Sequence, residues 1–219
     1  MSRTIRIASL ALITAGIVVL FDVAATLAWK EPISTLYTAI RQATASDEFE
    51  ALEESFPSAT GASQAELRRD AARLAKRFED ELRHGEGFAR LRIPAIGVDY
   101  TVVEGTDQAS LQKGPGHYPG TSLPGRKRTT AIAGHRTTYL APFRRLNELE
   151  AGDEVIVETP YVDVTYEVEH AEVVEPDRTD IVKDKGHERL VLTACHPLYS
   201  AAQRYAVFAD LKSLAEPGG

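Results

Sequence analysis

The sequence predicts a mainly β domain, either a barrel or a sandwich, that follows an N-terminal membrane helix and a helical stalk. Short apolar runs separated by glycine, proline and polar turns recur from residue 88 onward, which is typical of such folds rather than of a parallel α/β sheet. A long apolar run comes first in the chain, and a segment with helical periodicity follows it. The expected division is a cytoplasmic tip and anchor over residues 1–30, a stalk over 31–86 and a β domain over 87–215.

Residues 7–29 predict the membrane helix. This run of 23 residues contains one charge, Asp22, and as a helix it is about 34 Å long, enough to cross a hydrocarbon core of about 30 Å. Arg3 and Arg6 precede the run, so the positive-inside rule keeps the N-terminus in the cytoplasm and sends the rest outside the cell. Trp29 fits an aromatic anchor at the membrane interface.

A cleaved signal peptide is the alternative for this segment. Ala24, Ala25 and Ala28 leave room for a cleavage site, but the apolar region of a signal peptide is usually only about 7–15 residues long. No second apolar run of membrane length follows. We therefore expect a single-pass protein of the cell membrane with an extracellular body.

Composition narrows the class of partner. The chain is 43% hydrophobic and 26% charged, so it has the material for one folded domain, and its net charge is −7. Residues 1–30 carry +2, so the remainder carries −9, which argues against nucleic acid as the main partner. A single cysteine allows no internal disulfide and no CxxC metal site, and no EF-hand spacing is present. We expect neither a metal nor a cofactor.

The segment between the anchor and the β domain divides in two. Residues 30–62 contain two prolines and an acidic run, so we expect helical pieces but no core there. Ser63 and Glu66 resemble a capping box that opens a helix of about 63–84, which Gly85 ends. This helix is either packed on the next domain, as a stalk or lid, or a simple spacer.

The β domain is expected to contain seven short strands. A loop with four glycines and three prolines occupies residues 114–125. The predicted strands cover residues 88–93, 98–103, 130–134, 155–158, 162–168, 190–193 and 204–211.

Two of these strands end at reactive side chains, His135 and Cys195, and Arg204 follows nine residues after the cysteine. A lone thiol serves as core filler, metal ligand or nucleophile, and with a pKa near 8.5 it needs a base or a positive neighbour to act as a nucleophile. His135 can donate a proton to a leaving amine and take one from an incoming amine. Arg204 keeps its proton, so it can only donate hydrogen bonds to a developing oxyanion or to the substrate backbone. The three side chains must therefore converge on one face.

At these residues the chain resembles sortases, the membrane-anchored cysteine transpeptidases of Gram-positive-type envelopes. The sortase pattern is a histidine after a Gly-His turn, a Thr-Leu-x-Thr-Cys strand and an arginine about nine residues on, matched here by His135, Cys195 and Arg204. The resemblance covers about residues 88–212, and the runs Gly-His-Tyr-Pro-Gly-Thr and Ala-Gly-His-Arg-Thr-Thr-Tyr make class E sortases the most similar. It implies a closed sortase-like β-barrel with short helices. One departure concerns Ala194, which stands where a threonine usually precedes the cysteine, so the peptide preference stays open.

The resemblance also implies the reaction and its partners. Cys195 would attack the Thr-Gly bond of a Leu-Pro-x-Thr-Gly-like or Leu-Ala-x-Thr-Gly-like sorting signal on a secreted protein, and the thioacyl group would pass to an amine of a peptidoglycan precursor. The expected substrate contacts are His117, Tyr118, Thr193, Ala194 and His196. His117 is alternatively a turn residue. His196 is a less suitable candidate for the base than His135, because neighbouring side chains on a strand face opposite sides.

Three other functions remain open. A pilin-polymerising sortase would use a pilin lysine as acceptor, although the absence of a second apolar span before Gly219 counts against it. An exported cysteine peptidase would use water on the same thioacyl intermediate. A membrane-tethered β domain that only binds envelope partners would keep its function when Cys195 is replaced by alanine.

Overall fold

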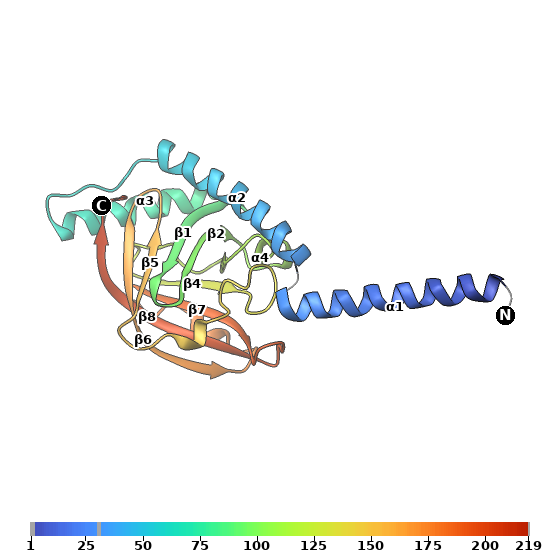
Figure 1. Ribbon diagram of the computed structural model, residues 1–219. Helices are drawn as coiled ribbons and strands as arrows, with labels where there is room; N and C mark the ends of the chain where they lie inside the picture. The colour runs from blue at the N-terminus through green and yellow to red at the C-terminus, as the bar shows by residue number, and fades with distance from the viewer. Residues whose placement is uncertain (1–2, 30–31, 219) are drawn as a thin grey trace.

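Eight strands form a closed β-barrel in the structure, a computed structural model that describes residues 3–29 and 32–218 (Figure 1). Around the barrel the strand order is β1, β2, β3, β4, β7, β8, β6 and β5, and β5 pairs with β1 to close it. The strands are β1 Gly87–Ile93, β2 Val98–Glu104, β3 Gly116–His117, β4 Thr129–Gly134, β5 Glu154–Glu158, β6 Asp163–Val174, β7 Arg189–His196 and β8 Gln203–Ala215. The helices are α1 Arg3–Trp29, α2 Pro32–Ser55, α3 Gln64–Glu81 and α4 Gln108–Leu111, with short 3-10 turns at Pro94–Ile96, Leu146–Glu148 and Thr179–Val182.

The barrel, rather than the sandwich, is therefore the observed form of the predicted β domain. All seven predicted strands are present, but β6 and β8 are each longer than expected, and the two-residue β3 was not predicted. The long antiparallel ladder between β6 and β8 runs from Asp163 opposite Ala215 to Val174 opposite Arg204. Two register shifts along it let this strand pair bend around the barrel. Alternate side chains point inward and fill one core, which includes the fully buried Tyr166.

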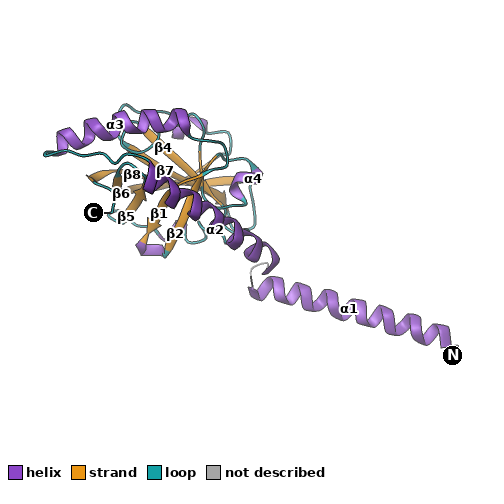
Figure 2. Ribbon diagram, turned by 90° about the horizontal axis from the view of Figure 1, so that it is seen from above, coloured by secondary structure: helices purple, strands orange, loops and turns teal. Residues whose placement is uncertain are grey.

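Helix α2 packs on the outside of the barrel against β1 and β2 (Figure 2). Its side chains Ala45 and Phe49 are 1% and 4% exposed, so the expectation that residues 30–62 contribute no core is wrong. The contact depends on Gly87, where a Cβ atom would lie 2.3 Å from the carbonyl oxygen of Ala45. The same glycine donates its N–H to Glu48 Oε2 at 2.8 Å. Helical periodicity alone did not reveal this face because polar residues interrupt it.

Helix α3 also belongs to the folded body. Ser63 caps it, since the Ser63 hydroxyl accepts from the N–H of Glu66 at 3.3 Å, as the sequence predicts. Phe78 is 2% exposed, and its ring lies against those of Phe56 and Tyr161, with centroids 4.9 and 5.7 Å away. Of the two interpretations of this helix, the packed one therefore describes the structure.

Helix α1 projects away from the barrel (Figure 1). Its side chains are described from residue 5 to residue 21, so the predicted roles of Arg3, Asp22 and Trp29 lie outside the described side chains. Among the residues that are described, no helix combines the length and the hydropathy needed to cross a membrane. The expected transmembrane span stays a prediction.

The packing of α3 leads to a stability prediction. Replacing Phe78 by alanine removes a buried ring and leaves a cavity between helix and barrel, so we expect the free energy of unfolding to fall by about 3–5 kcal/mol. Thermal unfolding of the purified chain measures this, with Lys76→Ala on the exposed side of the same helix as the control. Equal melting temperatures for the two variants would mean that α3 is a spacer after all.

Candidate active site

Strands β4, β7 and β8 bring three predicted residues to one end of the barrel. β4 and β7 run parallel, and their ladder ends with Gly134 opposite Ala194. His135 follows directly after β4, so it leaves the sheet beside Cys195. β7 and β8 run antiparallel, and Cys195 is paired with Arg204. His135, Cys195 and Arg204 therefore meet at the same edge, as the sequence predicts.

The side chain of Cys195 belongs to the outer face of β7. Leu192 and Ala194 are part of the core inside the barrel, whereas Val191 belongs to a second apolar cluster on the outside. Because side chains alternate along a strand, Cys195 has the same outward orientation as Val191. Directly paired residues of an antiparallel ladder present their side chains on one face, so Arg204 shares that face with the thiol.

Cys195 is a free and partly exposed thiol. Partial exposure sets it apart from an inert core cysteine. Within the described part of the chain, no group of three His, Cys, Asp or Glu side chains is arranged to hold a metal ion. A thiol in this position, next to a histidine and an arginine, is placed to react with an external group.

His135 is held in a half-buried position at the end of β4. Its carbonyl oxygen accepts from the N–H of Phe143 at 2.9 Å, and the ring of Phe143 lies so close to Gly134 that a Cβ atom there would be 2.5 Å from it. The ring of Tyr139 is tilted against the imidazole, with centroids 5.1 Å apart. The Nε2 atom of His135 is buried, with no hydrogen-bond partner among the described residues. Burial lowers the pKa of His135, so the imidazole is neutral near pH 7.

Arg204 lies on the turn side of the thiol. Its Nη1 donates to the carbonyl oxygens of Ala201 and Gln203, at 3.0 and 2.9 Å. Both acceptors are main-chain atoms, one in the β7–β8 turn and one at the start of β8, so the guanidinium is oriented without a carboxylate partner in the described chain. Its remaining N–H donors make Arg204 suited to bind a carbonyl oxygen or an oxyanion.

Two of the five expected substrate contacts lie on the face of the thiol. The hydroxyl groups of Tyr118 and Thr193 are hydrogen-bonded at 2.8 Å, and Thr193 is two residues before Cys195 on β7. Tyr118 also packs on the outer apolar cluster. Thr193 is 3% exposed, so the half-buried Tyr118 forms the accessible part of this pair, which we call the Tyr118–Thr193 wall beside the thiol.

His117 is placed differently from the expectation of a substrate contact. Its side chain is 3% exposed, Nδ1 lies 2.6 Å from Glu104 Oε2, and Nε2 lies 2.9 Å from Thr121 Oγ1. The cause is the parallel pairing of β2 with β3, which sets Glu104 opposite His117. With both ring nitrogens bonded inside the protein, His117 stabilises the loop rather than facing a ligand.

Ala194 and His196 are also turned away from the thiol. Ala194 is 3% exposed and lies in the barrel core, because it has the inward orientation on β7. His196 has the same orientation, with its Nδ1 3.3 Å from Arg136 Nη1 and its ring centroid 5.9 Å from that of Tyr205. Neither side chain therefore lies on the face that carries the thiol, and the predicted divergence of His196 from Cys195 is observed.

Arg136 is the residue at the site that the sequence analysis missed. It is 4% exposed, and its Nη1 donates to the carbonyl oxygen of Cys195 at 3.3 Å. The sequence does contain a signal for this residue, which is the alternation of side chains continued past the end of β4. If His135 faces outward, the next residue faces inward, and an arginine there must be buried.

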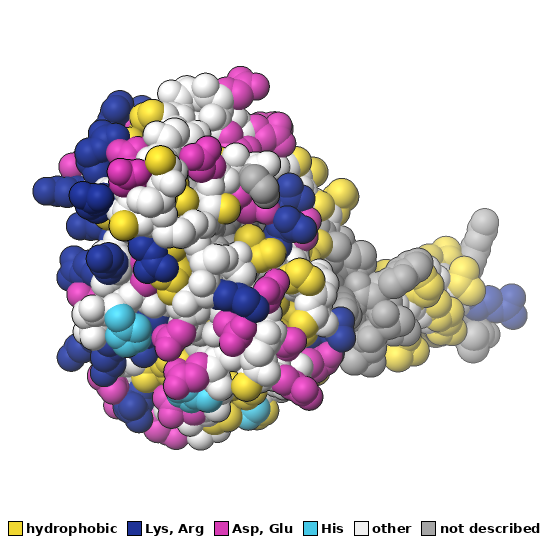
Figure 3. Space-filling model, turned by 90° about the vertical axis from the view of Figure 1, so that its left-hand side faces the viewer, with side chains coloured by type: hydrophobic (Ala, Val, Ile, Leu, Met, Phe, Trp, Pro, Cys, Tyr) yellow, Lys and Arg dark blue, Asp and Glu magenta, His cyan; other side chains and the backbone are white. Residues whose placement is uncertain are grey.

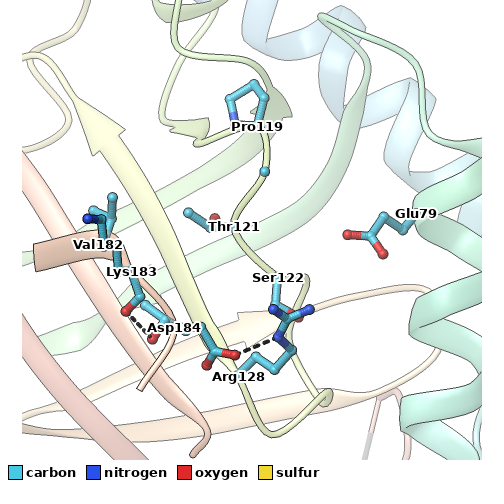
Figure 4. Close-up of a pocket in the computed structure, with 10 residues that line it drawn as sticks. Glu79, Pro119, Thr121, Ser122, Arg128, Val182, Lys183 and Asp184 are labelled. Atoms are coloured by element: carbon cyan, nitrogen blue, oxygen red, sulfur yellow. Dashed lines mark hydrogen bonds and ion pairs between the residues drawn. The ribbon is translucent and has the colours of Figure 1, made fainter. Parts of the chain in front are cut away.

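A separate cavity of about 340 Å³ lies at the other end of β4 (Figure 4). An ion pair between Arg128 and Asp184 forms one side of it, with 2.7 Å between nitrogen and oxygen, and Glu79 of α3 faces it from the opposite side. Thr129, the first residue of β4, lines the cavity, whereas His135 follows the last. At about 3.3 Å per residue the cavity and the thiol end are therefore about 20 Å apart.

Comparison with known proteins identifies the family. The Sortase domain family matches residues 91–212. Sortase D of Bacillus subtilis (strain 168) is 35% identical over 143 residues, which cover 64% of this chain and 70% of the relative. Sortase SrtE1 of Streptomyces coelicolor is 32% identical over 152 residues, which cover 62% of this chain and 43% of the relative. Among solved structures, sortase E from Streptomyces avermitilis has a TM-score of 0.56 and 32% identity, covering 61% of this chain and 93% of that chain.

The matched region runs from β1 into β8 and takes in more than half of the 219 residues, including the end of the barrel where His135, Cys195 and Arg204 meet. The fold, the free thiol and the similarity agree, and the chain belongs to the sortase family of transpeptidases.

Proposed function

We propose that this protein joins a secreted protein to an amine through a thioacyl intermediate on Cys195. The observation that carries the proposal is the register of β7, which sets Cys195 opposite Arg204 on one side and next to the end of β4 on the other. His135 follows β4 at that point. A nucleophile, a proton carrier and an oxyanion donor are thus supplied by three neighbouring strands.

In the first half of the reaction the sulfur of Cys195 attacks the carbonyl carbon of the scissile peptide bond. The thiol proton passes to the neutral imidazole of His135, whose pKa is lowered by burial and which is therefore able to accept it near pH 7. His135 then donates this proton to the leaving amine. The C–N bond breaks, and the acyl group remains on the sulfur as a thioester.

In the second half an acceptor amine attacks the thioester. His135 takes a proton from the incoming amine and returns it to the sulfur, so a new amide bond replaces the thioester and the free thiol is restored. Arg204 donates hydrogen bonds to the oxyanion of both tetrahedral intermediates. This role suits Arg204 because its Nη1 bonds to Ala201 and Gln203 hold the side chain near the turn.

The proposed donor is a Leu-Pro-x-Thr-Gly-like or Leu-Ala-x-Thr-Gly-like sorting signal, and the proposed acceptor is an amine of a peptidoglycan precursor. These follow from the family, while the wall formed by Tyr118 and Thr193 supports a peptide lying along β7 toward the thiol. The Tyr118 hydroxyl can bond a peptide N–H or C=O on that face.

We further propose that the N-terminal helix holds the protein at the cell membrane, with the N-terminus inside the cell and the barrel outside. Support comes from the large apolar side chains between Ile5 and Phe21, which are 53–75% exposed on α1. Figure 3 shows hydrophobic side chains on the coloured part of α1, whereas acidic and basic side chains are interspersed over the barrel face. An apolar surface of this extent is unfavourable in water and favourable in lipid.

The joining reaction is tested with the full chain in detergent, a Leu-Ala-x-Thr-Gly or Leu-Pro-x-Thr-Gly peptide and a small alkyl amine. We expect mass spectrometry to detect the amine-joined peptide with the wild type and no product with Cys195→Ala. His135→Ala should lower kcat/KM by about 10²–10⁴-fold, and Arg204→Met by about 10²–10³-fold. His187→Ala, on the exposed turn before β7, is the matched histidine control and should react as the wild type.

Each other result of this assay points to a different function. Cleaved but unjoined peptide at saturating amine would identify a peptidase that uses water. Product that forms equally well in the Cys195→Ala variant would contradict the proposed nucleophile. A folded wild-type chain that leaves both peptides and a pilin-type lysine peptide intact would favour an envelope-binding domain.

The Tyr118–Thr193 wall leads to a prediction about specificity. Tyr118→Phe and Thr193→Val each remove one hydroxyl of the 2.8 Å pair and leave the volume nearly unchanged. We expect both variants to change the ratio of kcat/KM between the Leu-Ala and Leu-Pro peptides, by about 10-fold, since one lost hydrogen bond is worth about 1 kcal/mol or more. If the ratio of kcat/KM for the two peptides were unaltered in both variants, the peptide would not bind against Tyr118 and Thr193.

Membrane attachment is tested in cells that produce the full chain. We expect it to stay with membranes through an alkaline carbonate wash and its barrel to be cut by protease added to intact cells. Replacing Ile13 and Ile17 with lysine should release the protein, whereas valine at both positions should not, because only the charges are costly in lipid. Release of the wild-type protein by the wash would contradict the proposed membrane anchor.

A further inference from the structure

Arg136 is a buried cation directly behind the proposed nucleophile, and it is the feature of the site that the reaction above leaves unused. It follows His135, but it turns into the end of the barrel. Its Nη1 lies 3.3 Å from both the carbonyl oxygen of Cys195 and Nδ1 of His196. Its Nη2 donates to Asn147 Oδ1 at 2.5 Å. All three acceptors are neutral.

The charge of Arg136 has no carboxylate partner among the described residues. The titratable and charged groups around it and Cys195 are His135 and Arg144 after β4, His196 on β7, and Arg204 and Tyr205 on β8. The guanidinium carbon lies 5.8 Å from the ring centroid of Tyr205, and its Nε is buried without a partner. Burying a charge this way is costly, so stability alone gives no reason to place an arginine here.

The balance of charges around Arg136 points toward the thiol. Burial lowers the pKa of Arg136, the positive charge of Arg144 lowers it further, and Tyr205 and Cys195, in their ionised forms, raise it. The bond from Nη1 to the Cys195 carbonyl oxygen places this unpaired charge directly behind the main chain of the nucleophile. The thiolate is the reactive form of cysteine.

Arg136 also contacts β7 at the point where its pairing with β4 ends. The parallel ladder between β4 and β7 stops at Gly134 and Ala194, one residue short of the nucleophile. Beyond that point β8 still pairs with Cys195, and the Arg136 side chain donates to the carbonyl oxygen of Cys195. Its contact with Nδ1 of His196 requires that nitrogen to be an acceptor, which makes His196 the neutral Nε2–H form.

We propose that Arg136 is a positioning residue of the transfer reaction, which holds Cys195 beside His135 from inside the barrel and places an unpaired positive charge behind the main chain of the nucleophile. The inference rests on the proposed function, because it assumes that Cys195 is the nucleophile. It assigns the two faces of β7 different tasks, with substrate on the outer face and Arg136 on the inner one.

The test compares thiol reactivity, turnover and stability in the full chain. We expect Arg136→Met to slow alkylation of Cys195 by iodoacetamide at pH 7 by about tenfold, as removal of one neighbouring positive charge implies. It should lower kcat by at least about tenfold with little change in KM, because the misplaced thiol affects the chemical step. Its melting temperature should be equal to or above that of the wild type, since an unpaired buried charge is removed.

Asn147→Asp is the second variant, and it keeps Arg136 in place. A carboxylate at this exposed position pairs with Nη2, so alkylation should slow although the guanidinium and its bond to Cys195 remain. Asn147→Ala, which adds no charge, should alkylate as the wild type. Arg136→Lys should retain the alkylation rate better than the methionine variant, because it keeps the charge and loses only the fork of donors.

Wild-type alkylation rates in both Arg136→Met and Asn147→Asp would overturn the proposal, as would a lower melting temperature of Arg136→Met with unchanged kcat. If Arg136→Met fails to fold, Asn147→Asp alone decides. Alkylation requires no peptide. A wild-type chain that fails to join peptides would therefore count against the proposed function, but the effect of Arg136 on the reactivity of Cys195 could still be measured.

Discussion

The register of β7 is the constraint on which the rest of the site depends. A slip of one residue against β4 or β8 would exchange the two faces of the strand, turning Cys195 into the barrel and Ala194 toward solvent. Leu190, Leu192 and Ala194 prevent this because all three are buried in the core. The apolar packing inside the barrel thereby determines which side chain is presented outside.

Both ends of the β4–β7 pair are fastened by a buried charged side chain. Where the strands begin, Glu188 accepts from the N–H groups of Gly125 and Lys127 and, at 3.1 Å, from the hydroxyl of Tyr166, and burial raises the pKa of this carboxyl. Where they end, Arg136 bonds the Cys195 carbonyl. A carboxylate that accepts several N–H and O–H bonds is well satisfied, whereas Arg136 is not. This difference agrees with a structural role for Glu188 and with the role proposed for Arg136.

Much of the fold was predictable from the sequence, because alternation along strands is local. The meeting of His135, Cys195 and Arg204 at one end of the barrel was predictable too, because two of the three follow or end recognisable strands. His117 was misjudged because its partner Glu104 is reached only through the pairing of β2 with the two-residue β3, which leaves no local pattern. The buried face of α2 left no local pattern for the same reason. It packs on β1 only because Gly87 has no side chain, and Gly87 lies 42 residues after its contact Ala45.

Burial of His135 limits how this residue can move a proton in the proposed reaction. Arg204 lies on the outer face of β8, Arg136 lies inside the barrel, and burial lowers the pKa of His135. A buried imidazole is less favourable in its positive form than in its neutral form. His135 is therefore suited to carry the proton only between steps, from thiol to leaving amine and from acceptor amine back to thiol. In the proposed reaction burial therefore disfavours a long-lived imidazolium at His135, so this residue releases the proton at the following step.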